Sequence, residues 1–183
     1  MNPTKFLVLA PLLAPVTAAA ADTTDGSLAV LLGTDSAFDG NPATLRLTLL
    51  GQGTLVDGEI AALDAAIPLT WMTSGEQTFG VSTHNSVVEI PPSLRLELLP
   101  KLPVRPYGDL GLGVAVSTTR YDGWLFGAAD RTAGWMTRSA VGVELGPPDG
   151  VMFIVEPLSA QTYHLGDEHY ARLSGMIGVG SHF

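Results

Sequence analysis

The stretch from Tyr170 to Phe183, YARLSGMIGVGSHF, alternates between two kinds of side chain along its whole length. Successive side chains of a β-strand point to opposite faces, so every second residue shares a face. One face is then mostly apolar, and the other holds small or polar residues and a single charge. The apolar face comprises Ala171, Leu173, Gly175, Ile177, Val179, Ser181 and Phe183. We therefore predict a β-strand here, ending on an aromatic residue with no polar tail.

The composition limits the class of protein to which the chain can belong. The chain has 183 residues, a net charge of −9, 46% hydrophobic residues and only 15% charged residues, and this length indicates one domain. Beyond the amino terminus no apolar stretch reaches the roughly 20 residues of a membrane helix, which leaves a tightly buried soluble fold or a β-barrel. The acidic balance argues against a nucleic-acid partner, because phosphate binding needs clustered Lys and Arg. The absence of cysteine removes disulfides and thiolate metal sites from consideration.

The amino terminus has the pattern of a secretory signal peptide over Met1 to Ala21. Lys5 supplies a positive start, Phe6 to Val16 an apolar run, and a series of alanines ending at Ala21 a cleavage region. The alternative, a buried N-terminal helix, is disfavoured by two prolines within the apolar run. We expect cleavage after Ala21 and a single mature domain over residues 22–183.

Period-two alternation recurs in seven earlier segments, which predicts eight strands in total. The clearest pattern among the seven is in Val87 to Leu98, whereas the weak alternation of Ser27 to Gly33 leaves its facing and extent open. The predicted strands before the last are Ser27–Gly33, Ala43–Leu50, Glu59–Met72, Val87–Leu98, Val104–Ser117, Trp135–Leu145 and Val151–Leu158.

The connections between these strands alternate in length and polarity. Longer or more polar connections follow the odd-numbered strands, and shorter ones follow the even-numbered strands. Outer-membrane barrels have short periplasmic turns and longer extracellular loops, and eight strands is their smallest common size. The expected loops are Thr34–Asn41, Thr73–Ser86, Thr118–Gly134 and Gln161–His169, and the expected short connections are Gly51–Gly58, Pro100–Pro103 and Gly146–Gly150.

Ten charged residues fall on the polar faces of the predicted strands, among many Gly, Ala and Ser. A water-exposed face would carry more Lys, Gln, Asn and Thr, so we expect these charges to line a narrow lumen, although a soluble barrel with an apolar interior is the alternative. In so narrow a barrel we expect a structural salt-bridge network, with a gated polar pathway as the alternative. The ten residues are Arg46, Asp64, Glu89, Arg95, Glu97, Asp109, Arg138, Glu144, Glu156 and Arg172.

The mature chain resembles the small bacterial outer-membrane β-barrel families of OmpA and OmpX type. The resemblance is carried by RPYGDLGLGVAV from Arg105 to Val116 and LSGMIGVGSHF from Leu173 to Phe183. It implies an all-β, eight-stranded, antiparallel up-and-down transmembrane barrel in the outer membrane, in contact with lipid and lipopolysaccharide. It also implies that Phe183 is an assembly signal, through which the last strand meets the barrel assembly machinery.

The expected function is non-enzymatic, in envelope integrity or in surface interaction through the extracellular loops, whose ligand the sequence does not identify. We expect no cofactor and no metal, since His164 to His169 matches no metal-ligand spacing and is typical of a polar loop tip. Three aromatic residues are predicted to sit at headgroup depth, namely Trp71, Trp135 and Tyr170.

Two other functions remain open. The spacing of His84 and Ser86 is similar to that of an outer-membrane lipid A deacylase family, which implies a base and a nucleophile, with Glu89 placed to orient the imidazole. Such a lipid-modifying hydrolase is the first alternative. A small pore is the second.

Overall fold

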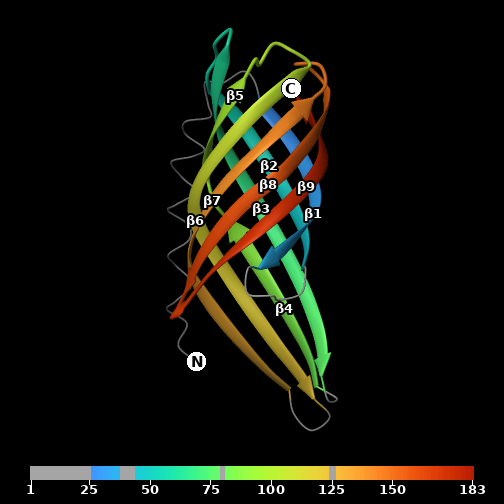
Figure 1. The fold of residues 1–183 in the computed structure, drawn as a ribbon, viewed down its shortest axis with the longest axis vertical. Coiled ribbons are helices and arrows are strands. Elements are labelled where there is room, and N and C mark those ends of the chain that lie inside the picture. Colours follow the sequence, from blue (N-terminus) through green and yellow to red (C-terminus); the bar gives the residue numbers. More distant parts are fainter. Residues whose placement is uncertain (1–25, 38–43, 79–80, 124–126) are drawn as a thin grey trace.

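The computed structural model describes residues 26–37, 44–78, 81–123 and 127–183. Within these ranges all regular structure is β, in nine antiparallel strands that form one ring-shaped sheet (Figure 1). No helix there is long and apolar enough to cross a membrane. The predicted signal peptide lies outside the described residues. The strands are β1 Gly26–Ala37, β2 Thr44–Val56, β3 Ala61–Thr78, β4 Val81–Ile90, β5 Ser93–Leu98, β6 Val104–Gly123, β7 Gly127–Leu145, β8 Val151–Leu165 and β9 Glu168–His182.

The ring closes between the first and last strands. Strand β9 pairs with β1 from Ser27↔His182 to Ala37↔Arg172. Beyond this ladder, the backbone groups of Gly26 and Phe183 exchange two hydrogen bonds of 2.9 Å each. Closure leaves no free sheet edge along this part of the barrel, which is the condition for a β-structure to stand in lipid.

The predicted single strand from Val87 to Leu98 is interrupted, and this prediction needs correction. Strands β4 and β5 both pair with β3 and β6, so together they occupy one position in the wall and the barrel has eight positions. The break falls at Pro91 and Pro92, which have no backbone N–H to donate to a ladder. Strand β6 passes close to this break, since a Cβ on Gly113 would collide with the carbonyl oxygen of Ile90.

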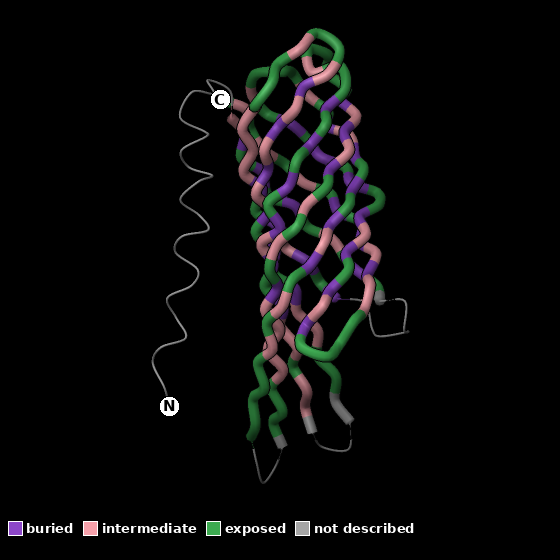
Figure 2. The backbone as a smooth tube through the Cα atoms, turned by 90° about the vertical axis from the view of Figure 1, so that its left-hand side faces the viewer, coloured by how far each residue is buried: buried purple, intermediate pink, exposed green. Residues whose placement is uncertain are grey.

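The two faces of the wall differ in exposure, as the alternation of buried and exposed residues along the strands shows (Figure 2). Large apolar side chains point outward, with Leu110 70% exposed and Ile177 66% exposed. The first strand, whose facing the sequence left open, has Leu28 outside and Leu31 inside. An apolar outer surface on this scale is typical of a barrel surrounded by lipid and not of a water-soluble monomer.

The expected loops are largely strand, so the sequence placed several strand ends too early and the starts of β4 and β7 too late. Most of the expected loop Thr73–Ser86 belongs to β3 and β4, and most of Thr118–Gly134 belongs to β6 and β7. Likewise β2 continues past Leu50, and β8 continues to Leu165. These extensions look like loops in the sequence because they carry no apolar face. A backbone ladder needs no apolar side chains to form, so they are strands all the same.

The extended parts of β3, β4, β6 and β7 project beyond the rest of the wall, at the end opposite the C-terminus (Figure 1). The ladder between β2 and β3 ends at Leu45↔Thr73, and that between β7 and β8 ends at Gly134↔Leu165. Pairing of β6 with β7 continues to Asp122↔Gly127. The result is a protruding sheet, formed by residues 74–78, 81–86, 118–123 and 127–133.

Candidate functional site

The interior of the barrel holds two connected groups of charged side chains, and the larger one spans β5 to β8. Its centre is Arg95, whose guanidinium lies 2.6 Å from Glu144 Oε1 and 3.5 Å from Asp109 Oδ2. Arg138 extends the group from Asp109, at 2.8 Å, to Glu156, at 2.6 Å. All five side chains are buried. The pairs therefore lie in a medium where an unpaired charge would be costly.

The same group continues toward the end of the barrel that carries the connections 57–60, 99–103 and 146–150, which we call the short-turn end. Arg105 lies 3.3 Å from Glu144 and 3.3 Å from Glu97. The chain of contacts then runs through seven residues with three positive and four negative charges. These are Glu156, Arg138, Asp109, Arg95, Glu144, Arg105 and Glu97.

The smaller group joins β9, β1, β2 and β4 near the other end. Arg172 lies 3.2 Å from Asp35, which lies 3.9 Å from Arg46, and Arg46 contacts Glu89 at 2.7 Å. The hydroxyl of Tyr163 donates a short hydrogen bond to Glu89. Two positive and two negative charges make this group neutral. Every wall position thus contributes to one of the two groups or, in the case of β3, packs beside them.

Tyr107 of β6 connects packing with charge inside the larger group. Its ring lies 3.7 Å from the guanidinium carbon of Arg95, and its hydroxyl donates to Glu156 at 3.1 Å. A cation over an aromatic face is attracted by the ring electrons. Tyr107 therefore shields Arg95 on one side and holds Glu156 in place on the other.

Uncharged side chains fill the space beside these groups. One cluster comprises Met72, Val87, Ala115, Met136, Tyr163 and Leu165, and Tyr170 packs against it. Met72, Met136 and Tyr163 have almost no solvent exposure. An eight-stranded barrel leaves just enough interior for its side chains, and in this one large side chains occupy it.

All ten sequence-predicted lumen charges lie buried on the interior side. Nine of them belong to the two groups, and Asp64 lies apart, beside a cavity at the short-turn end. Two members of the groups, Asp35 and Arg105, were missed. Asp35 lies two residues past the predicted strand Ser27–Gly33, so extending that strand would have found it. Arg105 lies inside the predicted strand Val104–Ser117 and shares the polar face of Asp109, so the alternation already contained its signal.

The three predicted interfacial aromatic residues divide into two kinds. Trp71 and Trp135 are exposed on the outer surface. Tyr170 instead stacks on Tyr163, with ring centres 4.8 Å apart, and lies beside Arg172. Tyr170 lies two residues before Arg172 on β9, so both side chains point into the barrel. The predicted placement of Tyr170 as an interfacial anchor is therefore wrong.

The hydrolase residues suggested by the sequence do not assemble as expected. His84 and Ser86 lie in β4 and not in a loop. Glu89 is paired with Arg46 in the interior, on the opposite face of the strand, so it cannot orient His84. Ser86 instead accepts a 2.8 Å hydrogen bond from Trp71 Nε1, and His84 Nε2 lies 3.1 Å from Ser82 Oγ.

The loop tip around β8 and β9 carries no metal-ligand group. His164 stacks on Trp135 at 3.6 Å, and His169 meets His164 edge-on at 4.6 Å. In the described part of the chain, no three His, Cys, Asp or Glu side chains are placed to hold a metal ion.

Several solved structures share this architecture. Neisserial surface protein A superposes with a TM-score of 0.62 at 14% identity, covering 87% of this chain and 96% of its own. Ail, the attachment invasion locus protein of Yersinia pestis, gives 0.58 at 13% identity, with 87% and 98% covered. The outer-membrane enzyme PagL gives 0.53 at 14% identity, with 85% and 98% covered.

At these identities the likeness establishes the fold alone. The predicted all-β, up-and-down barrel of the OmpA and OmpX type is therefore confirmed as a fold. The sequence matches no protein-family model and no curated protein.

Proposed function

We propose that this chain is a non-enzymatic barrel of the bacterial outer membrane that presents its protruding sheet to a partner outside the cell. The apolar outer face supports insertion in lipid, and lipopolysaccharide would contact its outer part. The signal peptide would direct export, and the last strand with Phe183 would be read by the barrel assembly machinery.

The observation that carries the surface role is the edge of β7 in the protruding sheet. Among the described residues, the segment from Gly127 to Ala133 pairs with β6 on one side and with no strand on the other. A strand edge offers a row of backbone donors and acceptors, to which an extended segment of another protein can add as a further strand. The partner is therefore inferred to be a protein with an exposed strand or extended peptide.

The interior charges have a structural role in this proposal. Two nearly neutral groups tie the wall together and fill the lumen, so the barrel is a closed support for the sheet and not a channel. A barrel of this kind also suits a contribution to envelope integrity.

Two barrels, the natural one and one with a shortened protruding sheet, test the proposal. Replacing residues 74–85 and residues 118–131 each by Asn-Gly would leave Thr73↔Ser86 and Ser117↔Thr132 as the last pairs before two-residue turns. Cells expressing the natural barrel should adhere to protein-coated surfaces, and cells with the shortened one should adhere less at equal surface levels. Equal adhesion would remove the surface role. An unheated sample that migrates no faster than a boiled one on a gel would remove the membrane barrel.

A lipid hydrolase is the second candidate, and the hydrogen bond between Ser82 and His84 is the observation that favours it. A base in contact with a hydroxyl is the minimum for an activated nucleophile. The structure thus shifts the candidate nucleophile from Ser86 to Ser82. A third group to orient His84 is not supplied by Glu89, which keeps this function second.

A further inference from the structure

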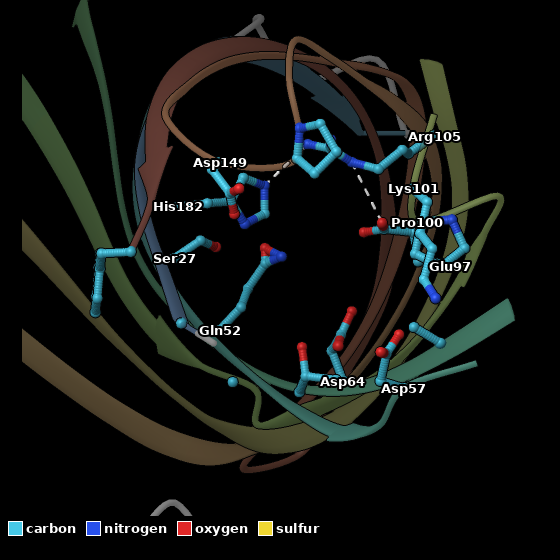
Figure 3. A pocket seen from close by; sticks show the side chains of 16 residues that line it. Ser27, Gln52, Asp57, Asp64, Glu97, Pro100, Lys101, Arg105, Asp149 and His182 are labelled. Atoms are coloured by element: carbon cyan, nitrogen blue, oxygen red, sulfur yellow. Dashed lines mark hydrogen bonds and ion pairs between the residues drawn. The ribbon is translucent and has the colours of Figure 1, made fainter. Parts of the chain in front are cut away.

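A cavity of about 190 Å³ opens at the short-turn end of the barrel, away from the protruding sheet. Figure 3 shows side chains from several strands converging on it, including Ser27, Gln52, Asp64 and His182. Turn residues Asp57 and Asp149 lie at its rim. The space is large enough for several water molecules or for an organic ion of a few carbon atoms.

Apart from Nε of Arg105, which lies 3.3 Å from the Glu97 carboxylate, two polar atoms of residues lining this cavity have no hydrogen-bond partner among the described residues. They are the hydroxyl of Ser27, which is 3% exposed, and Oδ1 of Asp64, which is 5% exposed. Buried polar groups are nearly always satisfied, and an unsatisfied one costs free energy. Both belong to residues that line the same cavity, so one occupant could satisfy both.

The lining favours a cation. It contains four carboxylates, from Asp57, Asp64, Glu97 and Asp149, and two permanent cations, Lys101 and Arg105, which leaves a net charge of −2 before His182 is counted. Arg105 is engaged by Glu97 and Glu144. The rest of the negative charge is available to a ligand.

The arrangement suits an organic ammonium better than a metal ion. A metal needs several ligands on one small sphere, and the described residues offer no group of three His, Cys, Asp or Glu placed that way. A primary ammonium has three donors and no acceptor, and it can donate to acceptors that are spread around a cavity. Asp64 and Ser27 are such acceptors.

We propose that this cavity is a binding site for a small organic cation with a primary ammonium group, held by Asp64 and Ser27 and attracted by the acidic rim. The ligand would enter from the side that the short turns face. The site does not depend on the surface role of the protruding sheet, because it lies at the other end of the barrel.

The test uses isotope-labelled residues 22–183 refolded in detergent micelles and titrated with 1,4-diaminobutane. We expect saturable changes in the backbone amide resonances of Ser27 and Asp64, which magnesium chloride at equal ionic strength does not reproduce. Asp64→Asn should weaken binding about tenfold or more, because a charge-assisted hydrogen bond is lost. Asp122→Asn removes one carboxylate at the opposite end and should leave the affinity unchanged.

Three outcomes would overturn the proposal. A titration without saturation means that the cavity holds only water, an equal response to magnesium means non-specific attraction of cations, and an unchanged affinity in Asp64→Asn means that the ion binds elsewhere. If Asp64→Asn does not refold, the double variant Asp57→Asn/Asp149→Asn replaces it. Both of these side chains are exposed, and their loss should weaken binding several-fold, whereas no change would again overturn the site.

Discussion

Gly142 lies directly against the side chain of Tyr107, so a Cβ at residue 142 would come within 2.5 Å of the Tyr107 ring and hydroxyl. The two residues face each other across the β6–β7 ladder. Tyr107 in turn contacts Arg95 and Glu156. The absence of a side chain at residue 142 is thus what allows an aromatic ring to stand between an arginine and a carboxylate.

Gly142→Ala should destabilise the barrel by about 1–3 kcal/mol, since overpacking forces the ring of Tyr107 out of position. Urea unfolding of the refolded protein in micelles measures the change. Gly108→Ala on β6 is the matched control, because a Cβ there meets no atom within 4 Å. Equal stability of the two variants would show that Tyr107 has room to move.

Arg95→Met should cost about 3–5 kcal/mol, because it leaves Asp109 and Glu144 buried with one partner fewer. The triple change Arg95→Met/Asp109→Asn/Glu144→Gln removes the charges together and should recover part of the loss. The midpoint of urea unfolding reports both effects. If the triple variant is no more stable than the single one, the cost does not come from unpaired charge.

Leu110→Lys separates a membrane barrel from a soluble one. A lysine on the lipid-facing side costs about 2–4 kcal/mol near the middle of the bilayer and little near its surface. Refolding into lipid vesicles, followed by the heat-dependent shift on a gel, should therefore give a smaller folded fraction. Leu102→Lys in the turn between β5 and β6 is the control, and equal yields for the two variants would argue against a lipid-facing Leu110.

Conductance in a planar bilayer should stay at background for the natural chain, because Met72, Met136 and Tyr163 fill the interior. Met136→Gly/Tyr163→Ala removes two of these side chains and should produce measurable single-channel steps. Steps of the same size in the natural chain would contradict the plugged interior.

Hydrolysis of lipopolysaccharide or phospholipid should be absent from the purified barrel in detergent. If it is present, Ser82→Ala should abolish it and Ser86→Ala should not, because His84 contacts Ser82. Mass spectrometry of the released fatty acid measures both. Loss of hydrolysis in Ser86→Ala alone would restore the original assignment.

The alternation of side chains predicted the barrel because burial on a strand wall follows a period of two. It was weakest where that wall stops being apolar. The ends of β3, β6 and β8 were placed too early, since a polar ladder looks like a loop in the sequence. Asp35 was missed for the same reason, as it lies just past the predicted strand Ser27–Gly33. Arg105 lies inside the predicted strand Val104–Ser117, on the same face as Asp109, and was left out of the predicted charge set.

The site residues depended on contacts that a linear pattern does not contain. The sequence shows that Arg95 and Glu144 share a polar face, but only the closed ring brings them within 2.6 Å. Likewise His84, Ser86 and Glu89 are close in sequence. Because side chains alternate along a strand, however, Glu89 lies on the opposite face from His84 and Ser86. The unsatisfied atoms of Ser27 and Asp64 have no sequence signature.

The ion pair between Arg172 and Asp35 lies across the seam where the last strand meets the first. A slip of one residue in this pairing would turn Arg172 toward lipid and leave Asp35 with only its 3.9 Å contact to Arg46, because each step reverses every side chain of the strand. Charge therefore adds a penalty for incorrect closure to the backbone ladder, whose hydrogen bonds would form almost equally well in either register. In kinetic terms, we expect a misaligned last strand to separate from β1 faster than a correctly aligned one.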